Sequence, residues 1–353
     1  MIQAISAAPP AARPPAPATP DTAYTDVFHR TTGWSGADGA YSVPLGNNRT
    51  AWLFSDTLIG DVGADGRRAN FAMARNSAAI QQGNDPATMQ FLLAPLGQHF
   101  TPPDGRGWLW MYDAAPAALP GRQTVLLGQF ETAGEPGVFD FRQIGNWMAD
   151  ASFDERGVTV SDYVRIPHFR AGDPTLAFGA AILVDGDWTY VYGTRDHRIT
   201  KDLVVARVPT GRLRDFAAWT FYDGAAWSAR VDDAHPIAGN VANELSVHRG
   251  HDGRFVLTTQ DGGTGAGILQ YDSDNPAGPW ANRRSVYVAP EHGQNTMAYN
   301  AKAHPELSDE RGLLISYNVN ATTPEYLLQD GGAYRPRFIR LPNQATESTS
   351  AAG

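Results

Sequence analysis

The sequence predicts an all-β fold, a single-domain five-bladed β-propeller. The first indication is composition: 36 Gly, 25 Pro, 13 Tyr and 9 Trp occur among 353 residues, and only 18% of the residues are charged. Such a mixture suits many short strands joined by turns better than it suits helices. The other two indications are a hairpin that recurs five times and a further strand after most of its copies.

Each copy of the hairpin is an apolar strand, a polar or glycine-containing turn and a second apolar strand. The first copy turns at residues 47–48, and the third turns at the Asp-Gly-Asp of residues 185–187. The five predicted hairpins span residues 41–57, 107–131, 176–196, 243–263 and 300–320.

Further strand-like runs follow four of the hairpins, at residues 71–82, 202–209, 267–274 and 336–342. Units of roughly 40 to 65 residues with three or four strands are typical of propeller blades. Five such units fill the chain from about Gly33 to Pro342. A pair of β-sandwiches is the alternative, but the repeats share their layout as well as their composition, which favours the propeller.

The charge balance argues against several partners. The net charge is −9, and Lys201 and Lys302 are the only lysines. We therefore expect no binding of nucleic acid or of an acidic membrane surface, both of which require basic clusters. No apolar run reaches the length of a membrane span. A neutral polysaccharide fits this balance better, and nothing in the sequence calls for more than a monomer.

The two ends of the chain are expected to lie outside the propeller. Residues 1–25 are rich in Ala and Pro and are predicted to be a disordered linker, residues 26–342 the catalytic propeller, and residues 343–353 a disordered tail. The start has no charged region followed by an apolar one, as a signal peptide has. We expect a secreted protein from which a signal peptide has been removed.

The hairpins of a propeller all point the same way around the axis, so their open ends gather at one pole. At these ends bulky apolar residues give way to carboxylates, amides, cations and aromatic rings. Candidates for binding a substrate at this pole are Arg195, Glu244, Gln260, Asn300, His304 and Asn318.

Two carboxylates stand at the open end of the first hairpin. With the turn centred at residues 47–48, Gly39 pairs with Asp56, and Asp38 becomes a diagonal neighbour of Asp56. Cross-strand neighbours lie roughly 4.5 to 8 Å apart between Cβ atoms. Two carboxylates at that spacing raise each other's cost of ionisation, so one titrates high and one low, as a glycosidase requires. The alternative is that both are turn caps or ion-pair partners.

Several neighbours of this pair suit a sugar site. Arg75 and Asn76 lie on the third strand of the first unit, close to the pole. Trp108 and Trp110 alternate on one strand, so they face the same way, either to stack on sugar rings or to form a core stripe between blades.

Two of the pole candidates carry alternatives of their own. Glu244 is a third carboxylate of the site or the ion-pair partner of an arginine such as Arg195. His304 contacts the substrate or tunes an aspartate, or it forms hydrogen bonds between blades.

Other chemistries lack their signals. The chain has no cysteine, no H-E-x-x-H, no P-loop and no G-x-S-x-G elbow. The glycine-rich run at residues 260–267 leads into a strand, so it is not a dinucleotide motif. No calcium loop of the D-x-[DN]-x-[DN]-G type occurs. We expect that no cofactor is required, and an axial Ca²⁺ remains open.

Several stretches together carry a family resemblance. They are "GWSGADGAYSVPLGNNRTAWLFSDTLIG" from Gly33, "ARNSAAIQ" from Ala74, "AFGAAIL…YVYGTR…LVVARVP", "GPW" and "AHPEL…GLLISYNVN…YRPRFI". The chain resembles, from Gly33 to Leu341, bacterial proteins of the DUF4185 and DUF5005 type, whose members are grouped as endo-D-arabinanases in glycoside hydrolase family 183.

This resemblance implies a secreted bacterial enzyme with a five-bladed propeller. It implies cleavage of internal α-linked D-arabinofuranosyl bonds in mycobacterial arabinogalactan and lipoarabinomannan. It also implies catalysis by the two aspartates of the first motif, which Asp38 and Asp56 match here. Ser55 departs from the pattern, which has Gly before the second aspartate, but Ser is small.

By analogy with other five-bladed furanosidases, we expect Asp38 as general base and Asp56 as general acid in an inverting reaction, with the reverse order open. Inversion needs carboxyl groups roughly 6.5 to 9.5 Å apart, and retention needs about 5 Å. If Glu244 is the acid, Asp56 tunes it. An exo-acting furanosidase or transglycosylase and a non-catalytic carbohydrate-binding propeller are the alternatives.

Overall fold

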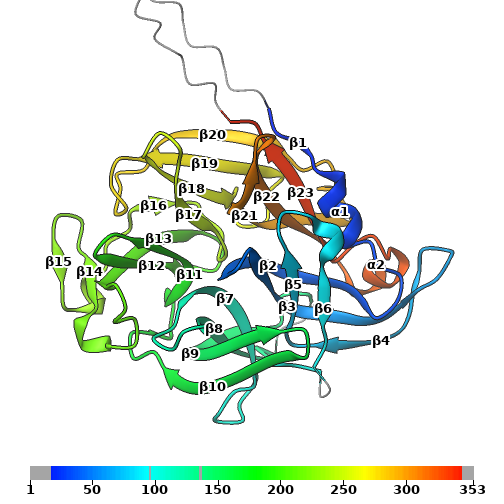
Figure 1. Ribbon diagram of the computed structural model, residues 1–353, viewed down its shortest axis with the longest axis horizontal. Coiled ribbons are helices and arrows are strands. Elements are labelled where there is room, and N and C mark those ends of the chain that lie inside the picture. The colour runs from blue at the N-terminus through cyan, green and yellow to red at the C-terminus, as the bar shows by residue number, and fades with distance from the viewer. Residues whose placement is uncertain (1–16, 95–96, 135–136, 344–353) are drawn as a thin grey trace, which may run out of the picture.

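Five antiparallel sheets stand around a central axis in the computed structural model, which describes residues 17–94, 97–134 and 137–343 (Figure 1). The strands nearest the axis are β2 (Trp34–Gly46), β7 (Trp108–Pro116), β11 (Thr175–Asp185), β17 (Ser246–Arg249) and β21 (Thr296–Asp309). This arrangement confirms the predicted five-bladed β-propeller. Each predicted hairpin forms the two innermost strands of one blade.

The remaining strands continue each blade outwards from the axis. In the first blade these are β3 (Arg49–Val62), β5 (Ser77–Gln82) and β6 (Gln90–Leu92), with β4 (Arg68–Ala74) also paired to β3. The second blade adds β8 (Gln123–Glu131), β9 (Arg142–Asp154) and β10 (Gly157–Arg165). The third adds β12 (Trp188–Asp196), β13 (Lys201–Pro209), β14 (Thr220–Tyr222), β15 (Trp227–Ser228) and β16 (Ala238–Gly239). The fourth adds β18 (Phe255–Gln260), β19 (Gly267–Ser273) and β20 (Ala281–Val288).

The fifth blade joins the two ends of the described chain. Its later strands are β22 (Gly312–Ala321), β23 (Arg335–Leu341) and β1 (Thr19–Pro20), and β1 comes from the start of the chain. Figure 1 shows β1 in blue beside β23 in red. Part of the predicted linker, residues 1–25, is therefore ordered: residues 19–20 pair with β23, and the helix that follows begins at Thr22. Residues 1–16 and the predicted tail from 344 lie outside the described residues.

A short helix, α1 (Thr22–Val27), follows β1 and carries aromatic residues into the seam between the first and fifth blades. Phe28 stacks on Phe338 of β23 at 5.1 Å and meets Trp52 of β3 edge-on at 6.1 Å. All three side chains are fully buried. This seam fixes the fifth blade against the first.

The other described helices are equally short: α2 (Pro324–Gln329) and three 3-10 turns at Pro86–Thr88, Phe216–Ala218 and Val231–Asp233. None of the described helices is long and apolar enough to cross a membrane.

The register of the first hairpin differs from the prediction. Gly39 pairs with Phe54, not with Asp56, and both aspartates lie inside their strands rather than at the strand ends. An irregularity between Pro44 and Gly46 shifts the pairing beyond the turn by one residue, and two bulges beside Asp38 shift the partner of Gly39 by one more. On β3, Ser55 and Asp56 together oppose the single residue Asp38.

The second bulge lies on β2, where Ala40 has no partner between the pairs Gly39–Phe54 and Tyr41–Leu53. Gly39 and Ala40 both have left-handed backbone conformations, with φ of 89° and 64°. The two bulges cancel, so the strands resume the same register on either side. Between them Asp38 stands directly across from Asp56.

A buried ion pair joins the start of the described chain to β23 and so holds the fifth blade together. Arg340 of β23 donates to Asp21 at 2.8 Å, and both side chains are about 5% exposed or less. Asp21→Asn keeps the shape and the cap of α1 but leaves the guanidinium charge buried without its closest counter-ion. We expect a loss of about 3 kcal/mol in the free energy of unfolding, measured by urea denaturation.

Asp85→Asn is the matched control, because Asp85 caps an exposed 3-10 turn and carries no buried partner charge. Its expected effect is below about 0.5 kcal/mol. Equal effects of the two substitutions would show that the ion pair does not hold the closure.

Candidate active site

Asp38 has an incomplete set of hydrogen bonds. Its Oδ2 accepts from the phenols of Tyr334 at 3.2 Å and Tyr299 at 3.4 Å. Its Oδ1 is shielded from solvent and has no hydrogen-bond partner in the described part of the chain. Burial raises the pKa of Asp38 well above its ordinary 3.8, and the charges of Asp56 and Glu244 add to the effect. The environment of Asp38 thus favours its protonated form.

Asp56 faces two strong donors. Arg75 Nη1 donates to both carboxylate oxygens, at 3.1 and 3.3 Å, and Trp110 Nε1 donates to Oδ1 at 2.9 Å. Burial raises the pKa of Asp56, but Arg75 and Trp110 counteract this. Hydrogen bonds to a carboxylate favour its charged form. The two neighbouring carboxylates therefore differ in their environments.

The predicted aromatic residues belong to this surrounding shell. Trp110, predicted to stack on sugar rings or fill the core, is partly exposed and donates its N–H to Asp56. Trp108 is largely buried, and the guanidinium of Arg75 lies 4.1 Å above its ring. This stacking holds Arg75 in place beside Asp56.

Glu244 pairs with a lysine rather than with Arg195. Lys302 of β21 donates to Glu244 Oε2 at 2.6 Å, and both residues are buried. Arg195 instead donates to the carbonyl of Ala234 at 2.7 Å. Glu244 thus lies close enough to Asp38 to affect its pKa, but its carboxylate is bound to an internal cation.

Two other predicted residues, Asn76 and Gln260, are buried and donate hydrogen bonds within the protein. The Asn76 amide donates to the carbonyls of Phe100 and Leu109 and accepts from two backbone N–H groups. Gln260 donates to the carbonyls of Gly265 and Gly267. Gln260 Oε1 has no partner among the described residues, but it is shielded from solvent, as is the rest of the side chain.

His304 lies in the interior between two blades. Its ring nitrogens contact Ser42 Oγ of β2 at 2.6 Å and Ser316 Oγ of β22 at 2.8 Å. The side chain is fully buried and lies 4.9 Å from the ring of Trp52. This is the bridging role between blades that the sequence left as the alternative.

The last two predicted residues border the aspartate pair. Asn318 of β22 donates to the carbonyl of Ala37, the residue before Asp38. Asn300 has a left-handed backbone with φ of 57°, and its carbonyl accepts from Lys302. Both therefore act on the site through the backbone.

Sequence reasoning missed Tyr299, Tyr334 and Lys302 as members of the site. Lys302 did carry a signal, because it is one of two lysines in the chain and lies on a predicted inner strand. Tyr299 is the fourth residue of the same strand. Tyr334 is the first residue of the "YRPRFI" stretch that carries the family resemblance, but it reaches Asp38 only through the fold.

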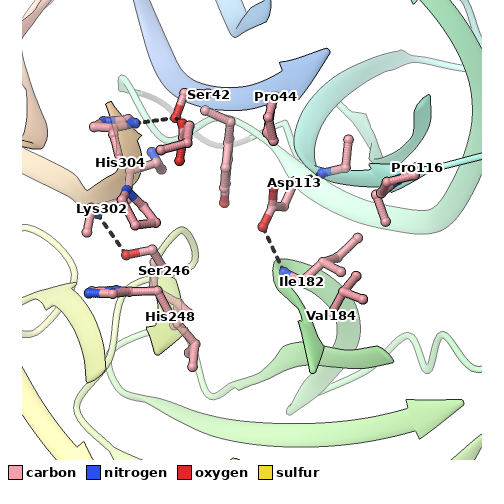
Figure 2. A pocket seen from close by; sticks show the side chains of 18 residues that line it. Ser42, Pro44, Asp113, Pro116, Ile182, Val184, Ser246, His248, Lys302 and His304 are labelled. Carbon is pink, nitrogen blue, oxygen red and sulfur yellow. Dashed lines mark hydrogen bonds between the residues drawn. The ribbon is translucent and has the colours of Figure 1, made fainter. Parts of the chain in front are cut away.

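A cavity of about 330 Å³ lies between the inner strands, at a different place from the aspartate pair (Figure 2). It is lined by Asp113 of β7, His248 of β17 and His304 of β21, among others, but not by Asp38 or Asp56. Inner strands of all five blades line it, so it lies at the propeller axis, where the axial Ca²⁺ that the sequence left open would bind.

The groups around this cavity do not fit a calcium ion. Asp113 accepts from the backbone N–H groups of Ala114 and Ile182, as Figure 2 shows for Ile182. Glu306 is hydrogen-bonded by Ser42. Burial raises the pKa of Asp113 to about 6 and that of Glu306 to about 7. Among the described residues, no three His, Asp or Glu side chains are grouped to hold a metal ion.

The chain matches a known protein family over most of its length. Residues 21–344 match the family described as a domain of unknown function, DUF5005. The chain belongs to this family.

Notoamide biosynthesis cluster protein J of Aspergillus sp. (strain MF297-2) is 28% identical to this DUF5005 protein over 150 residues. Protein J′ of Aspergillus versicolor is 29% identical over 156 residues. The match spans 41% of this chain and about two-fifths of each fungal protein, 39% and 42%.

Solved structures share the fold of this DUF5005 protein. A putative hydrolase from Bacteroides ovatus superposes with a TM-score of 0.75 at 22% identity, covering 91% of this chain and 89% of that one. The GH43_1 enzyme from Xanthomonas citri, solved with xylotriose, has a TM-score of 0.51 at 16% identity, with coverage of 93% and 90%. These similarities show a propeller fold that glycoside hydrolases also use.

The unpartnered oxygen of Asp38 predicts a gain in stability from Asp38→Asn in this DUF5005 protein. The pKa of Asp38 is raised in the folded state. At a pH above this pKa the folded protein carries a carboxylate charge that is poorly solvated, whereas water solvates the same charge in the unfolded chain. At pH 8 we expect Asp38→Asn to raise the free energy of unfolding by about 1 kcal/mol or more. Below pH 3.8 the carboxyl is neutral in both states, and the difference disappears.

Urea denaturation at several pH values measures this effect. Asp56→Asn is the matched control, because it also loses the ion pair with Arg75 and should gain less or lose stability. A wild-type protein that is as stable as Asp38→Asn at pH 8 would contradict the interpretation of the Asp38 environment.

Proposed function

We propose that this protein is a secreted, endo-acting glycoside hydrolase that cleaves internal α-D-arabinofuranosyl linkages of D-arabinan, as in mycobacterial arabinogalactan and lipoarabinomannan. The observation that carries the proposal is the juxtaposition of Asp38 and Asp56 across the double bulge, with unequal environments. One protonated and one ionised carboxyl group are what glycoside hydrolysis requires. The resemblance of the first hairpin to the endo-D-arabinanases supports the choice of substrate.

The hydrogen bonds favour the reverse of the order of roles expected from other furanosidases. Asp56 receives donors from Arg75 and Trp110, so we assign it as the ionised base. Asp38 is disfavoured as an anion, so we assign it as the acid that protonates the leaving oxygen. In the inverting reaction that we propose, Asp56 activates the attacking water.

Aromatic residues beside Asp56 support a neutral, ring-shaped substrate. Phe130 and Phe141 lie 4.3 and 4.7 Å from Trp110, between ring centroids, and Phe139 is 59% exposed. Sugars present apolar C–H faces that pack on such rings, whereas polyanions seek cations. The aromatic group thus provides a wall along which a furanose chain can lie.

Product analysis tests the proposal directly. Wild-type protein incubated with mycobacterial arabinogalactan is expected to give a ladder of D-arabino-oligosaccharides. Asp38→Asn and Asp56→Asn should each lose about 10³-fold in rate or more, because general acid and base catalysis both disappear.

The same experiment separates the alternatives. Monosaccharide or a transfer product in the first minutes would indicate an exo-acting furanosidase or a transglycosylase. Binding of arabinan without any product, unchanged in both variants, would indicate a carbohydrate-binding propeller. If the wild type is inert on D-arabinan, the substrate assignment fails.

The roles of the two aspartates can be told apart by the leaving group. A 4-nitrophenyl oligo-arabinofuranoside needs no protonation of its leaving oxygen. On this substrate Asp38→Asn should recover most of its loss, to within about tenfold of wild type, while Asp56→Asn should not recover. Recovery of Asp56→Asn alone would reverse the assignment.

A further inference from the structure

The ammonium group of Lys302 lies near Asp38, which we assign as the acid. We propose that Lys302 is a positioning residue of the site: it holds the bulge that carries Asp38 and, with Glu244 as its counter-ion, sets the ionisation of that carboxyl group. This inference rests on the proposed function for its kinetic readout only.

All the donor capacity of Lys302 is used within the protein. Its Nζ donates to Glu244 Oε2 at 2.6 Å, to the carbonyl of Gly39 at 2.6 Å and to the carbonyl of Asn300 at 3.0 Å. The ring of Tyr41 lies 4.3 Å from it. An ammonium has three protons, so none remains for a substrate. Lys302 therefore acts through other residues.

The bond to Gly39 fixes the residue that follows Asp38. Gly39 and Ala40 have φ of 89° and 64°, and the left-handed conformation is strained for Ala. Such a conformation persists only where the surroundings enforce it. Lys302 supplies that enforcement from the fifth blade, and a shift of Gly39 would turn the Asp38 side chain away from Asp56.

Charged and titratable groups face Asp38 from every strand around it. These are Asp56 of β3, Glu244 before β17, Tyr299 and Lys302 of β21, and Tyr334 before β23. Glu244 raises the pKa of Asp38 and Lys302 lowers it, so the two charges of the buried pair act on Asp38 with opposite sign.

These opposite effects on the pKa of Asp38 provide a test. An ion pair with only a structural role would leave the titration of Asp38 unchanged. In Glu244→Gln the amide oxygen still accepts from Lys302, but the negative charge is gone, so Asp38 should titrate lower by about one pH unit. In Lys302→Met/Glu244→Gln the positive charge is gone too, so Asp38 should titrate higher again by a similar amount. The double variant should also lose about tenfold in kcat, because Gly39 loses its donor.

Two readouts follow Asp38. One is the pH–rate profile on D-arabinan. The limb of this profile that Asp38 governs should move to lower pH in Glu244→Gln and back to higher pH in the double variant. The other is the ¹³C carboxyl signal of aspartate-labelled protein, assigned by its loss in Asp38→Asn. If the wild type has no activity on D-arabinan, the proposed function fails, while the carboxyl titration still decides this inference.

Asp21→Asn is the matched control, because it breaks a buried ion pair remote from Asp38. It should lower stability without moving the titration of Asp38. The inference is overturned if Asp38 titrates at the same pH in Glu244→Gln and in the double variant. If the double variant does not fold, an unchanged titration in Glu244→Gln against wild type overturns it equally.

Discussion

The double bulge in the first hairpin is the constraint on which the site depends. The pairs on either side of it, Ala37–Thr57 and Tyr41–Leu53, share one register, and this register sets Asp38 opposite Asp56. Within the double bulge Ser55 and Asp56 of β3 share Asp38 as their partner, and the extra residue on β2, Ala40, restores the register. The strands are thus undisturbed beyond the site, and the cost of the left-handed backbone is confined to two residues.

Burial of like charges is the second cost of this arrangement. Asp56 and Glu244 are buried and Asp38 is partly buried, and burial raises the pKa of each. Two cations offset it from opposite sides, Arg75 at Asp56 and Lys302 at Glu244. Asp38 has no cation of its own, and this asymmetry allows one carboxyl group to keep its proton beside an ionised neighbour.

The closure of the propeller brings the fifth blade to this hairpin. Tyr299 and Lys302 lie on β21, more than 250 positions from Asp38 in the chain, and their placement depends on the seam between the first and fifth blades. The aromatic cluster around Phe28 and Trp52 packs that seam. Interlocking through β1 therefore contributes to the site as well as to stability.

The sequence alone determined the blade count, because hairpin repeats with turn residues are local patterns that strand periodicity makes readable. It also identified the aspartate pair and Arg75, since these follow from position on one hairpin and its next strand. It misjudged the partner of Gly39 by two residues, because bulges leave no periodic signal. Only the tertiary structure brought Tyr299, Tyr334 and Lys302 to Asp38.

The same limit explains the amides and His304. A polar residue near a strand end gives the same sequence pattern whether its side chain faces a substrate or is hydrogen-bonded to a loop. The packing of neighbouring blades decided that Asn76, Gln260 and His304 spend their hydrogen bonds inside the protein. Sequence periodicity gives the face of a strand, but the partner across a blade seam is set by closure of the whole ring.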